Sequence, residues 1–371
     1  MQISIAAGGT GGHVYPATAI AEALAGLEPD ARLTFIGSVG GFERPLIEAS
    51  PVKFAQYIEV QSGPINGVGI LRAGVSLVKL GIGTAQALAF MLRHRPDALL
   101  LTGGWVCVPG GIAAWLLRVP SMISLPDIEP ALTIKALRHL ATRVAVTAPD
   151  SLRYFRAGQA VVTGYPLRQA LLTATRAAGI AHFGLDPARR TLLVFGGSRG
   201  ARSINRAVAA ILPELLADGV QVLWVTGTLD WDEVVGVLKQ PGLTPEGERV
   251  KAFAYLHEDM ALALASADLV VSRSGASVLG ELTLFGLPSI LVPYPYAWRY
   301  QKVNADYLVR QGAAVMVEDG RMSETLLPTI RQIMRDDVRR GAMARASAAL
   351  AQPQGAANAA RELIRLANKE R

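Results

Sequence analysis

The sequence has one cysteine, Cys107, among 371 residues. A single cysteine excludes an internal disulfide and a cysteine metal site, so Cys107 is expected to be a small buried residue in a reducing compartment. Lysine-rich runs and basic stripes interleaved with aromatic residues are also missing, which disfavours nucleic acid as a partner. No basic segment with a cleavage site precedes the first apolar run. We therefore expect no signal peptide and a cytoplasmic protein.

Low-complexity segments are absent as well, and 51% hydrophobic with 18% charged residues is a globular composition. The length suffices for two domains, each with its own core. The formal net charge is +7, from 37 basic and 30 acidic residues. Such a mild basic excess suits phosphate-bearing ligands and an anionic membrane surface equally well.

Two glycine-rich turns stand at nearly the same point in each half of the chain, Gly8–Gly12 before His13 and Gly196–Gly200 before Ala201. Each follows an apolar run and precedes an amphipathic stretch, which is the order strand, turn, helix. Glycine allows close approach of a ligand to the backbone, and the start of a helix offers free N–H groups and a positive dipole end to phosphate. The pair predicts a cleft enzyme that handles phosphorylated molecules from both sides.

Apolar runs typical of strands alternate with helical segments in both halves. The expected strands are 3–7, 33–36, 98–101, 121–124, 143–146 and 160–163, then 192–195, 221–225, 250–253, 269–272, 289–292 and 314–317. Beyond about residue 322 the chain is expected to be helical, with a break at 353–355. The pattern predicts an α/β protein with one doubly wound parallel sheet in each half. The predicted domains are 1–165 and 166–345, followed by a last helix within 346–371.

The run from Leu80 to Leu92 carries no charge and is flanked by basic residues such as Lys79 and Arg93. It is shorter than the ~20 apolar residues that span a bilayer. Two interpretations stay open, a buried helix of the first domain and an apolar surface, ringed by basic side chains, that rests on an anionic membrane.

The common nucleotide-binding motifs are incomplete. A dinucleotide fingerprint needs glycine where Val14 stands, and the next expected strand ends in Ile36-Gly37-Ser38 rather than in an acidic residue. A phosphate-binding Walker loop needs Gly-Lys-Ser/Thr, which does not occur. A single glycine turn is weak evidence, but two turns that carry His13 and Ser198 are stronger.

The segment from Gly8 to Ala17 resembles the opening motif of the MurG family, bacterial N-acetylglucosaminyltransferases that make lipid II from lipid I and UDP-N-acetylglucosamine. Further matching motifs follow in the family's order over residues 3–318. They are 103–105, 109–111, 164–168, 196–201 with Asn205, 273–276 with Glu281, 286–288, 292–294, Gln301 and Asn304. The resemblance implies a GT-B fold, in which two Rossmann-like domains face each other across a cleft and the last helix returns to the first domain.

The resemblance implies that the second domain holds the UDP-sugar. Ser198 and the amides of 197–201, Gly200 among them, would hold the diphosphate at a helix N-terminus. Glu281 would accept hydrogen bonds from the ribose hydroxyls, because a carboxylate offers two acceptor oxygens to a vicinal diol. Gln301 would bind the N-acetylglucosamine hydroxyls.

Three more residues belong to the implied substrate site. Asn205 would support the cleft, and Asn304 would bind substrate. Arg168 would lie near the nucleotide, where it would neutralise charge or help to close the domains. Taken alone, Ser198 would suit a helix N-cap, and Arg168 would suit a pair with a surface carboxylate. The ordered set of motifs favours substrate binding.

Glycosyl transfer to a hydroxyl needs a base for the attacking oxygen and stabilisation of the leaving diphosphate. His13 is the first candidate, since an ordinary imidazole titrates near pH 6.5. It would also suit a turn histidine bonded to the backbone, or a residue that holds the acceptor diphosphate. Thr10, Gly11 and Gly12 of the same turn are expected to contact substrate.

The sequence departs from the family at Ser124-Leu125-Pro126-Asp127, where MurG proteins typically carry His-Glu-Gln-Asn. Asp127 is a second candidate for the catalytic base, and it would equally suit the N-cap of a helix that begins near Pro130. Trp105 would stack on the acceptor sugar or pack in the interior. The departure keeps two alternatives open, a UDP-sugar-dependent transferase with another lipid acceptor and a non-catalytic UDP-sugar-binding homologue.

Asp230-Trp231-Asp232 matches an Asp-x-Asp pattern that binds manganese in the other large glycosyltransferase fold, but a solvated helix start is favoured here. We expect no metal and no cofactor, because a helix dipole and arginines can stabilise the leaving diphosphate. The predicted reaction is inverting transfer of N-acetylglucosamine to the C4 hydroxyl of the muramyl sugar of lipid I. The predicted partners are UDP-N-acetylglucosamine, the polyprenyl-diphosphate-linked muramyl-peptide acceptor and the cytoplasmic face of the cell membrane. The protein would be peripheral there and touch the membrane around Leu71–Leu92.

Overall fold

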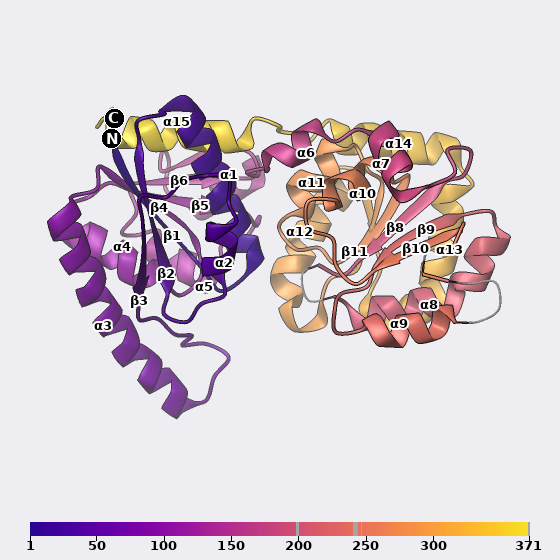
Figure 1. Ribbon diagram of the computed structural model, residues 1–371, viewed down its shortest axis with the longest axis horizontal. Coiled ribbons are helices and arrows are strands. Elements are labelled where there is room, and N and C mark those ends of the chain that lie inside the picture. The colour runs from indigo at the N-terminus through magenta and orange to yellow at the C-terminus, as the bar shows by residue number, and fades with distance from the viewer. Residues whose placement is uncertain (198–199, 240–243, 246, 370–371) are drawn as a thin grey trace. The chain divides into compact units, whose positions relative to one another are not determined.

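A computed structural model describes residues 1–197, 200–239, 244–245 and 247–369. The chain divides into two compact units (Figure 1). The first comprises Met1–Arg168 together with Gln352–Arg371, and the second comprises Gln169–Ala351. The division thus falls between Arg168 and Gln169, and the last helix belongs to the first unit.

The first unit is built on a parallel sheet of seven strands in the order β3-β2-β1-β4-β5-β6-β7. The strands are β1 Gln2–Ala7, β2 Arg32–Ser38, β3 Gln56–Val60, β4 Ala98–Gly103, β5 Ser121–Leu125, β6 Arg143–Val146 and β7 Ala160–Val162. The helices are α1 Gly11–Leu27, α2 Glu43–Glu48, α3 Ile70–His94, α4 Cys107–Leu116, α5 Leu132–Leu137, the 3₁₀ turn η1 Pro149–Tyr154 and α15 Gly355–Ala367.

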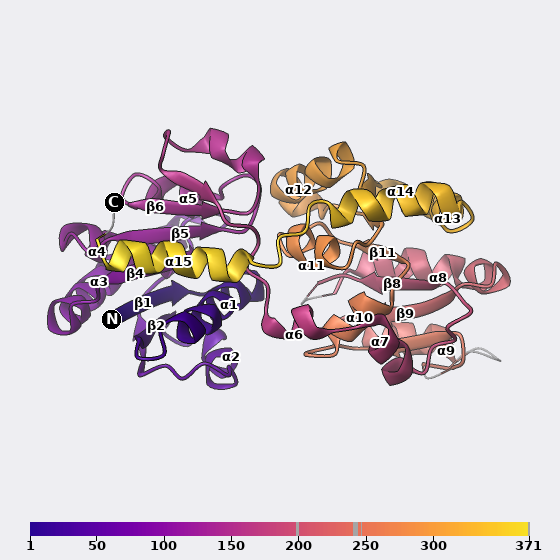
Figure 2. The ribbon, with the colours of Figure 1, turned by 90° about the horizontal axis from the view of Figure 1, so that it is seen from above.

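Both faces of this sheet are covered, which is why its central strands read as continuous apolar runs. On one face Ile3 and Ile5 pack against residues of α1 and α15, including Leu24 and Leu363. On the other face residues such as Leu99 pack against α3, α4 and α5. Figure 2 shows α15 lying along the first unit, where it contacts α1, β4 and β5.

The second unit contains a parallel sheet of six strands in the order β10-β9-β8-β11-β12-β13. The strands are β8 Thr191–Phe195, β9 Gln221–Val225, β10 Val250–Phe253, β11 Leu269–Ser272, β12 Ser289–Leu291 and β13 Ala314–Met316. The helices are α6 Gln169–Thr173, α7 Arg176–Phe183, α8 Arg202–Ala217, α9 Trp231–Leu238, α10 Met260–Ser266, α11 Val278–Leu284, α12 Trp298–Arg310, α13 Met322–Met334 and α14 Asp337–Ala348, with short 3₁₀ turns η2 Pro295–Ala297 and η3 Asp319–Arg321.

The prediction of two doubly wound parallel sheets is confirmed. In each sheet the strand order reverses at one point, between β1 and β4 and between β8 and β11. The two glycine turns follow β1 and β8, and so lie at these switch points, where open α/β sheets bind ligands. The edge strand β3 was not expected from the sequence, because its residues Gln-Tyr-Ile-Glu-Val form no apolar run and only the last of them is fully buried.

Helix α3 extends well beyond the uncharged run that marks it in the sequence. With 25 residues it is, among the described residues, the one helix long and apolar enough to cross a membrane by length and composition. One stripe, Ser76, Leu80, Gly83, Ala87 and Met91, is buried, and α3 packs on α4 and β3. A Cβ on Gly83 would lie 1.9 Å from the carbonyl oxygen of Gln61, so glycine allows the close approach of the helix.

A second stripe of the same helix is apolar and exposed. The spacing of its residues places them on one face of the helix. They are Leu71, Val75, Val78 and Ile82, which are 88%, 57%, 64% and 48% exposed. Helix α3 therefore combines the two expected roles, a core-facing helix and an apolar outer surface.

Candidate functional site

The first glycine turn packs directly against a second pair of glycines at the end of β4. Gly9, Gly103 and Gly104 have φ values of 84°, 130° and 87°. A Cβ on Gly104 would lie 2.3 Å from the carbonyl oxygen of Gly8. The two loops can therefore meet only because both lack side chains at this point.

His13 lies in the first turn of α1 and is half-buried. Its Nδ1 is 2.9 Å from the carbonyl oxygen of Gly8 and 3.3 Å from Oγ1 of Thr10. A carbonyl oxygen only accepts, so a neutral His13 carries its proton on Nδ1 and leaves Nε2 as an acceptor. The ring also contacts the β4 loop, since a Cβ on Gly103 would lie 2.4 Å from Cδ2 of His13. The backbone bond and a base role at Nε2 are thus compatible.

Glu43, at the start of α2, is fully buried beneath this turn and was not singled out in the sequence. Its Oε1 accepts a hydrogen bond from the Ser38 amide at 2.5 Å, and within the described part of the chain its Oε2 has no hydrogen-bond partner. A Cβ on Gly8 would lie 2.9 Å from Oε1. Burial, followed by the nearby Glu43 carboxylate, raises the pKa of Tyr57. No local sequence pattern signals this carboxylate, because its burial depends on Gly8 of another loop as well as on the nearby Gly41.

Asp127 lies just beyond the carboxyl end of β5 and is half-buried. Helix α5 begins at Leu132 with Ala131 at its N-cap position, so the alternative that Asp127 caps this helix is wrong. The loop is held from the next strand, since Oγ1 of Thr147 donates to the carbonyl of Pro126 at 2.9 Å. One strand, β4, separates β1 from β5, which places the ends of these strands about 10 Å apart. Both candidate bases therefore lie at the same edge of the sheet.

Trp105 and Arg168 are the other predicted residues of the first unit. Trp105 follows β4 and is half-buried, beside the Gly103–Gly104 loop. Arg168 is the last residue before the second unit, and its guanidinium lies 4.7 Å from the centre of the Tyr15 ring on α1. The cation–π contact fixes Arg168 next to the helix that follows the first glycine turn.

The second glycine turn follows β8 and leads into α8. Gly197 and Gly200 have φ values of 84° and 77°, and the Gly200 amide donates to the Gly197 carbonyl at 2.9 Å. A Cβ on Gly200 would lie 2.6 Å from the carbonyl oxygen of Thr226. Ser198 lies outside the described residues.

Asn205 supports the second turn from within the protein. It is 3% exposed, its Nδ2 donates to the Thr226 carbonyl at 2.7 Å and to Asp230 at 3.0 Å, and its Oδ1 accepts from the Trp224 indole at 3.0 Å. The solvated helix start expected at Asp230 is wrong, because this carboxylate is 4% exposed and also binds Nε of Arg202 at 2.8 Å. Tertiary contacts with α8 bury it, which the loop sequence does not reveal.

Glu281, Gln301 and Asn304 lie on the two helices that follow the next strands of this sheet. Glu281 is in the first turn of α11 and is half-buried. Oε1 of Gln301 accepts from the Tyr294 amide at 2.9 Å, and the fully buried Asn304 donates to the Ser274 carbonyl at 3.1 Å. Gln301 and Asn304 thus hold the loops that follow β12 and β11.

Arg273 belongs to a quoted motif, but its role was not predicted. The nearly buried guanidinium binds Asp319 at 2.6 Å, Oγ of Ser203 at 2.7 Å and the Val292 carbonyl at 3.1 Å. It therefore ties α8 to the loops that follow β11, β12 and β13, and acts as a support for the carboxyl edge of the sheet.

Cys107 is fully buried, as predicted, and its Sγ lies 3.1 Å from the carbonyl oxygen of Gly103. Burial raises the pKa of this thiol to about 12. Within the described ranges no group of three or more His, Cys, Asp or Glu side chains could hold a metal ion.

Two domain families match the chain. Residues 3–146 match the N-terminal domain of glycosyltransferase family 28, and residues 191–363 match its C-terminal domain. A protein of Roseiflexus sp. (strain RS-1) is 39% identical, over 94% of this chain and 91% of its own length. A protein of Desulforudis audaxviator is 38% identical, over 95% of both chains. Both relatives carry the name UDP-N-acetylglucosamine--N-acetylmuramyl-(pentapeptide) pyrophosphoryl-undecaprenol N-acetylglucosamine transferase.

The crystal structure of Acinetobacter baumannii MurG has the same fold. It matches with a TM-score of 0.76 and 24% sequence identity, over 98% of this chain and 99% of that one. At this level of identity the match establishes the GT-B fold.

Proposed function

The chain belongs to glycosyltransferase family 28 and to its MurG branch, and from this premise we propose that it transfers N-acetylglucosamine from UDP-N-acetylglucosamine to lipid I with inversion. The observation that carries the proposal is the match over nearly the whole chain to relatives that bear this activity in their names. The two glycine turns at the switch points of both sheets support it.

In the proposed reaction the first unit supplies the base. Nε2 of His13 takes the proton from the C4 hydroxyl of the muramyl sugar, while the bond from Nδ1 to Gly8 keeps the ring in the required tautomer. The C4 oxygen then bonds to the anomeric carbon as the bond from that carbon to UDP breaks. Asp127 is the second candidate for the base, and Thr10, Gly11, Gly12 and Trp105 would contact the acceptor.

In the same proposal the second unit holds the donor. The backbone amides of the turn that contains Ser198 and Gly200 would bind the diphosphate and stabilise its charge as it leaves. Glu281 would bind the ribose hydroxyls and Gln301 would line the sugar site. The buried Asn304 would hold the loop after β11, and Asn205 would keep the glycine turn in place. Arg168 would approach the nucleotide.

The decisive experiment measures UDP release from UDP-N-acetylglucosamine with and without lipid I. We expect strong stimulation by lipid I, loss of turnover in the variant that lacks the base, and retained donor binding in that variant. His13→Ala and Asp127→Asn therefore identify the base. Donor binding with no stimulation would contradict the lipid I assignment.

A transferase with another lipid acceptor is the second candidate, and the replaced segment 124–127 favours it. Under that alternative, UDP release would respond to other lipid acceptors instead of lipid I. A protein that binds the donor and never releases UDP would point to the non-catalytic alternative.

We also propose that the protein docks on the cytoplasmic face of the cell membrane through the exposed stripe of α3. The stripe is apolar, and the exposed basic residues Arg72, Lys79 and Arg93 lie on the same helix, a combination that suits an anionic lipid surface. The paired substitution Leu71→Glu and Val78→Glu should abolish flotation of the protein with vesicles that contain anionic lipid. The matched control is Val338→Glu, an equally apolar residue on α14 that is 81% exposed. Unchanged flotation of the α3 variant would refute this surface.

A further inference from the structure

A cavity of about 390 Å³ lies in the second unit at the amino end of its sheet. Arg190 and Val220, which line it, directly precede β8 and β9, whereas the glycine turn follows the other end of β8. Since β8 has five residues, the cavity and that turn are about 17 Å apart along the strand. The cavity is therefore separate from the proposed donor site.

Arginines dominate the wall of this cavity. The charged lining residues are Arg189, Arg190, Arg331, Arg335, Asp218 and Asp337, and the apolar ones include Leu215, Ile330 and Met334. This makes four guanidinium groups against two carboxylates. Four cations around one cavity are unfavourable unless carboxylates or a bound anion compensate for them.

The carboxylates hold the arginines in fixed positions. Asp218 binds Arg331 at 2.6 Å and Arg335 at 2.8 Å. Asp337 binds Arg190 at 2.6 Å and also Arg340 at 2.8 Å. These hydrogen bonds to arginine lower the pKa of both carboxyl groups, so both stay ionised at neutral pH.

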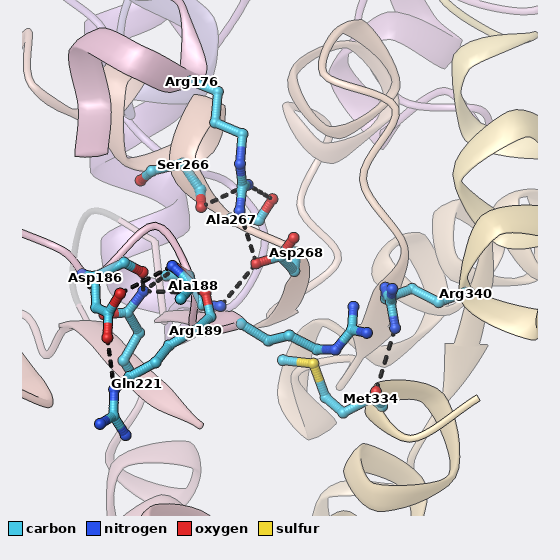
Figure 3. Close-up of polar contacts among 12 residues, drawn as sticks. Arg176, Asp186, Ala188, Arg189, Gln221, Ser266, Ala267, Asp268, Met334 and Arg340 are labelled. Carbon is cyan, nitrogen blue, oxygen red and sulfur yellow. Dashed lines mark hydrogen bonds and ion pairs between the residues drawn. The ribbon is translucent and has the colours of Figure 1, made fainter. Parts of the chain in front are cut away.

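The remaining charges near the cavity leave a net positive balance. Arg189 is bound by Asp186 at 2.9 Å. Arg340 and Asp186 extend the cluster, and the carboxylate of Glu214 also acts on Arg331. The cluster then contains five guanidinium groups and four carboxylates, an excess of one positive charge. Figure 3 shows Arg176 of the same unit, which pairs with Asp268 at 3.0 Å and also donates to two backbone carbonyls. That pair is balanced, and the cavity cluster is not.

A phosphate group matches this arrangement. Each guanidinium has five N–H donors in a planar fork that suits phosphate oxygens. In the described part of the chain the four lining arginines use only a few of these donors in hydrogen bonds to protein acceptors. Arginines already held by carboxylates lose less conformational freedom when they bind a ligand. The volume lies in the range of small-molecule sites. The cavity is a cleft that is partly open to solvent, and a concave site of this size favours a small ligand over the flat surface of a macromolecule.

We propose that this cavity binds a small anion with a phosphate or diphosphate group. The site does not depend on the proposed transferase function, because it uses none of the residues assigned to donor, acceptor or base. A ligand here would tie the starts of β8 and β9 to α13 and α14.

The test is calorimetric titration of the full chain with inorganic pyrophosphate, in the presence of saturating UDP so that the donor site is occupied. We expect one further site per chain, whose affinity falls as ionic strength rises. Arg190→Gln and Arg335→Gln should each weaken it at least tenfold. The side chain of Arg335 is 66% exposed, and Asp218 retains its ion pair with Arg331 when Arg335 is replaced. The Arg335→Gln variant should therefore still fold.

Arg345→Gln is the matched control, because Arg345 is an exposed arginine of α14 that does not line the cavity. It should leave the affinity for pyrophosphate unchanged. The absence of a second site, or an equal loss of affinity in the control, would overturn the proposal. So would binding of an acidic peptide such as polyglutamate without binding of pyrophosphate, since that result would indicate a protein partner.

Discussion

The glycine turn after β1 and the glycine turn after β8 occupy equivalent places in their sheets, but their surroundings differ. The first turn packs on glycines of the β4 loop and keeps a half-buried histidine whose Nε2 is left as an acceptor. The second turn packs on the Thr226 loop, where Asn205 and Asp230 are buried and bonded to the protein. The difference indicates separate roles. The first unit provides a titratable group, and the second provides a rigid turn whose backbone can bind a ligand.

The largest effect should come from His13→Ala. Loss of a general base typically lowers the rate by about 10²–10⁴-fold, and the donor KM should stay close to that of the unchanged protein. Steady-state kinetics with lipid I measures both. His182→Ala, at a half-exposed histidine of the second unit, is the control and should be fully active. A fall in donor affinity as large as the fall in rate would show that the two units do not have these separate roles.

Glu281→Ala should have the complementary effect in the second unit. Hydrogen bonds to a charged group contribute about 1.5–3 kcal/mol, so the donor KM should rise about tenfold to a hundredfold while kcat changes little. The same kinetic assay tests this, with Glu324→Ala on the exposed face of α13 as control. A variant with normal donor KM and reduced kcat would move Glu281 into the catalytic step.

Alanine at Gly104, which packs against the first turn, and at Gly200 of the second turn compares the two turns directly. Gly104→Ala and Gly200→Ala each place a Cβ at positive φ and within 2.3 Å and 2.6 Å of a carbonyl oxygen. Each should lower the free energy of unfolding by about 1–3 kcal/mol or more. Gly81→Ala, in open space on α3, should raise it by about 0.5–1 kcal/mol. Urea denaturation measures all three, and tolerance at Gly200 alone would show that its turn is the more adaptable.

The smallest effect concerns pH and the second unit. Hydrogen bonds from Arg331 and then Arg335 lower the pKa of Asp218 below its value in the unfolded chain. The pair thus stabilises the fold above the unfolded pKa of about 3.9, and this contribution is lost as the pH falls through the folded value. It should amount to at most about 1 kcal/mol, since both arginines are partly exposed. Asp218→Asn should reduce the fall in melting temperature as the pH is lowered into the acid range. An unchanged pH dependence of the melting temperature would contradict this.

Features set by local sequence could be predicted. The central strands are apolar runs because they are buried on both faces, and the turns are marked by glycine, so the sheets and their switch points follow from the pattern. Features set by tertiary contacts could not. The burial of Glu43 depends on Gly8 of another loop as well as on the nearby Gly41, and the burial of Asp230 depends on α8. Edge strand β3 lacks the apolar run of a strand buried on both faces.

The helix α15 makes the first unit discontinuous in sequence. Its side chains, Leu363 among them, complete the core that also contains Ile20 and Leu24 of α1. During synthesis from the N-terminus, residues 169–351 emerge as a full unit before this helix does. The second unit can therefore fold while the first still lacks the part of its core that α15 supplies beside α1. The unit that is synthesised first is thus completed only when the last residues of the chain have been made.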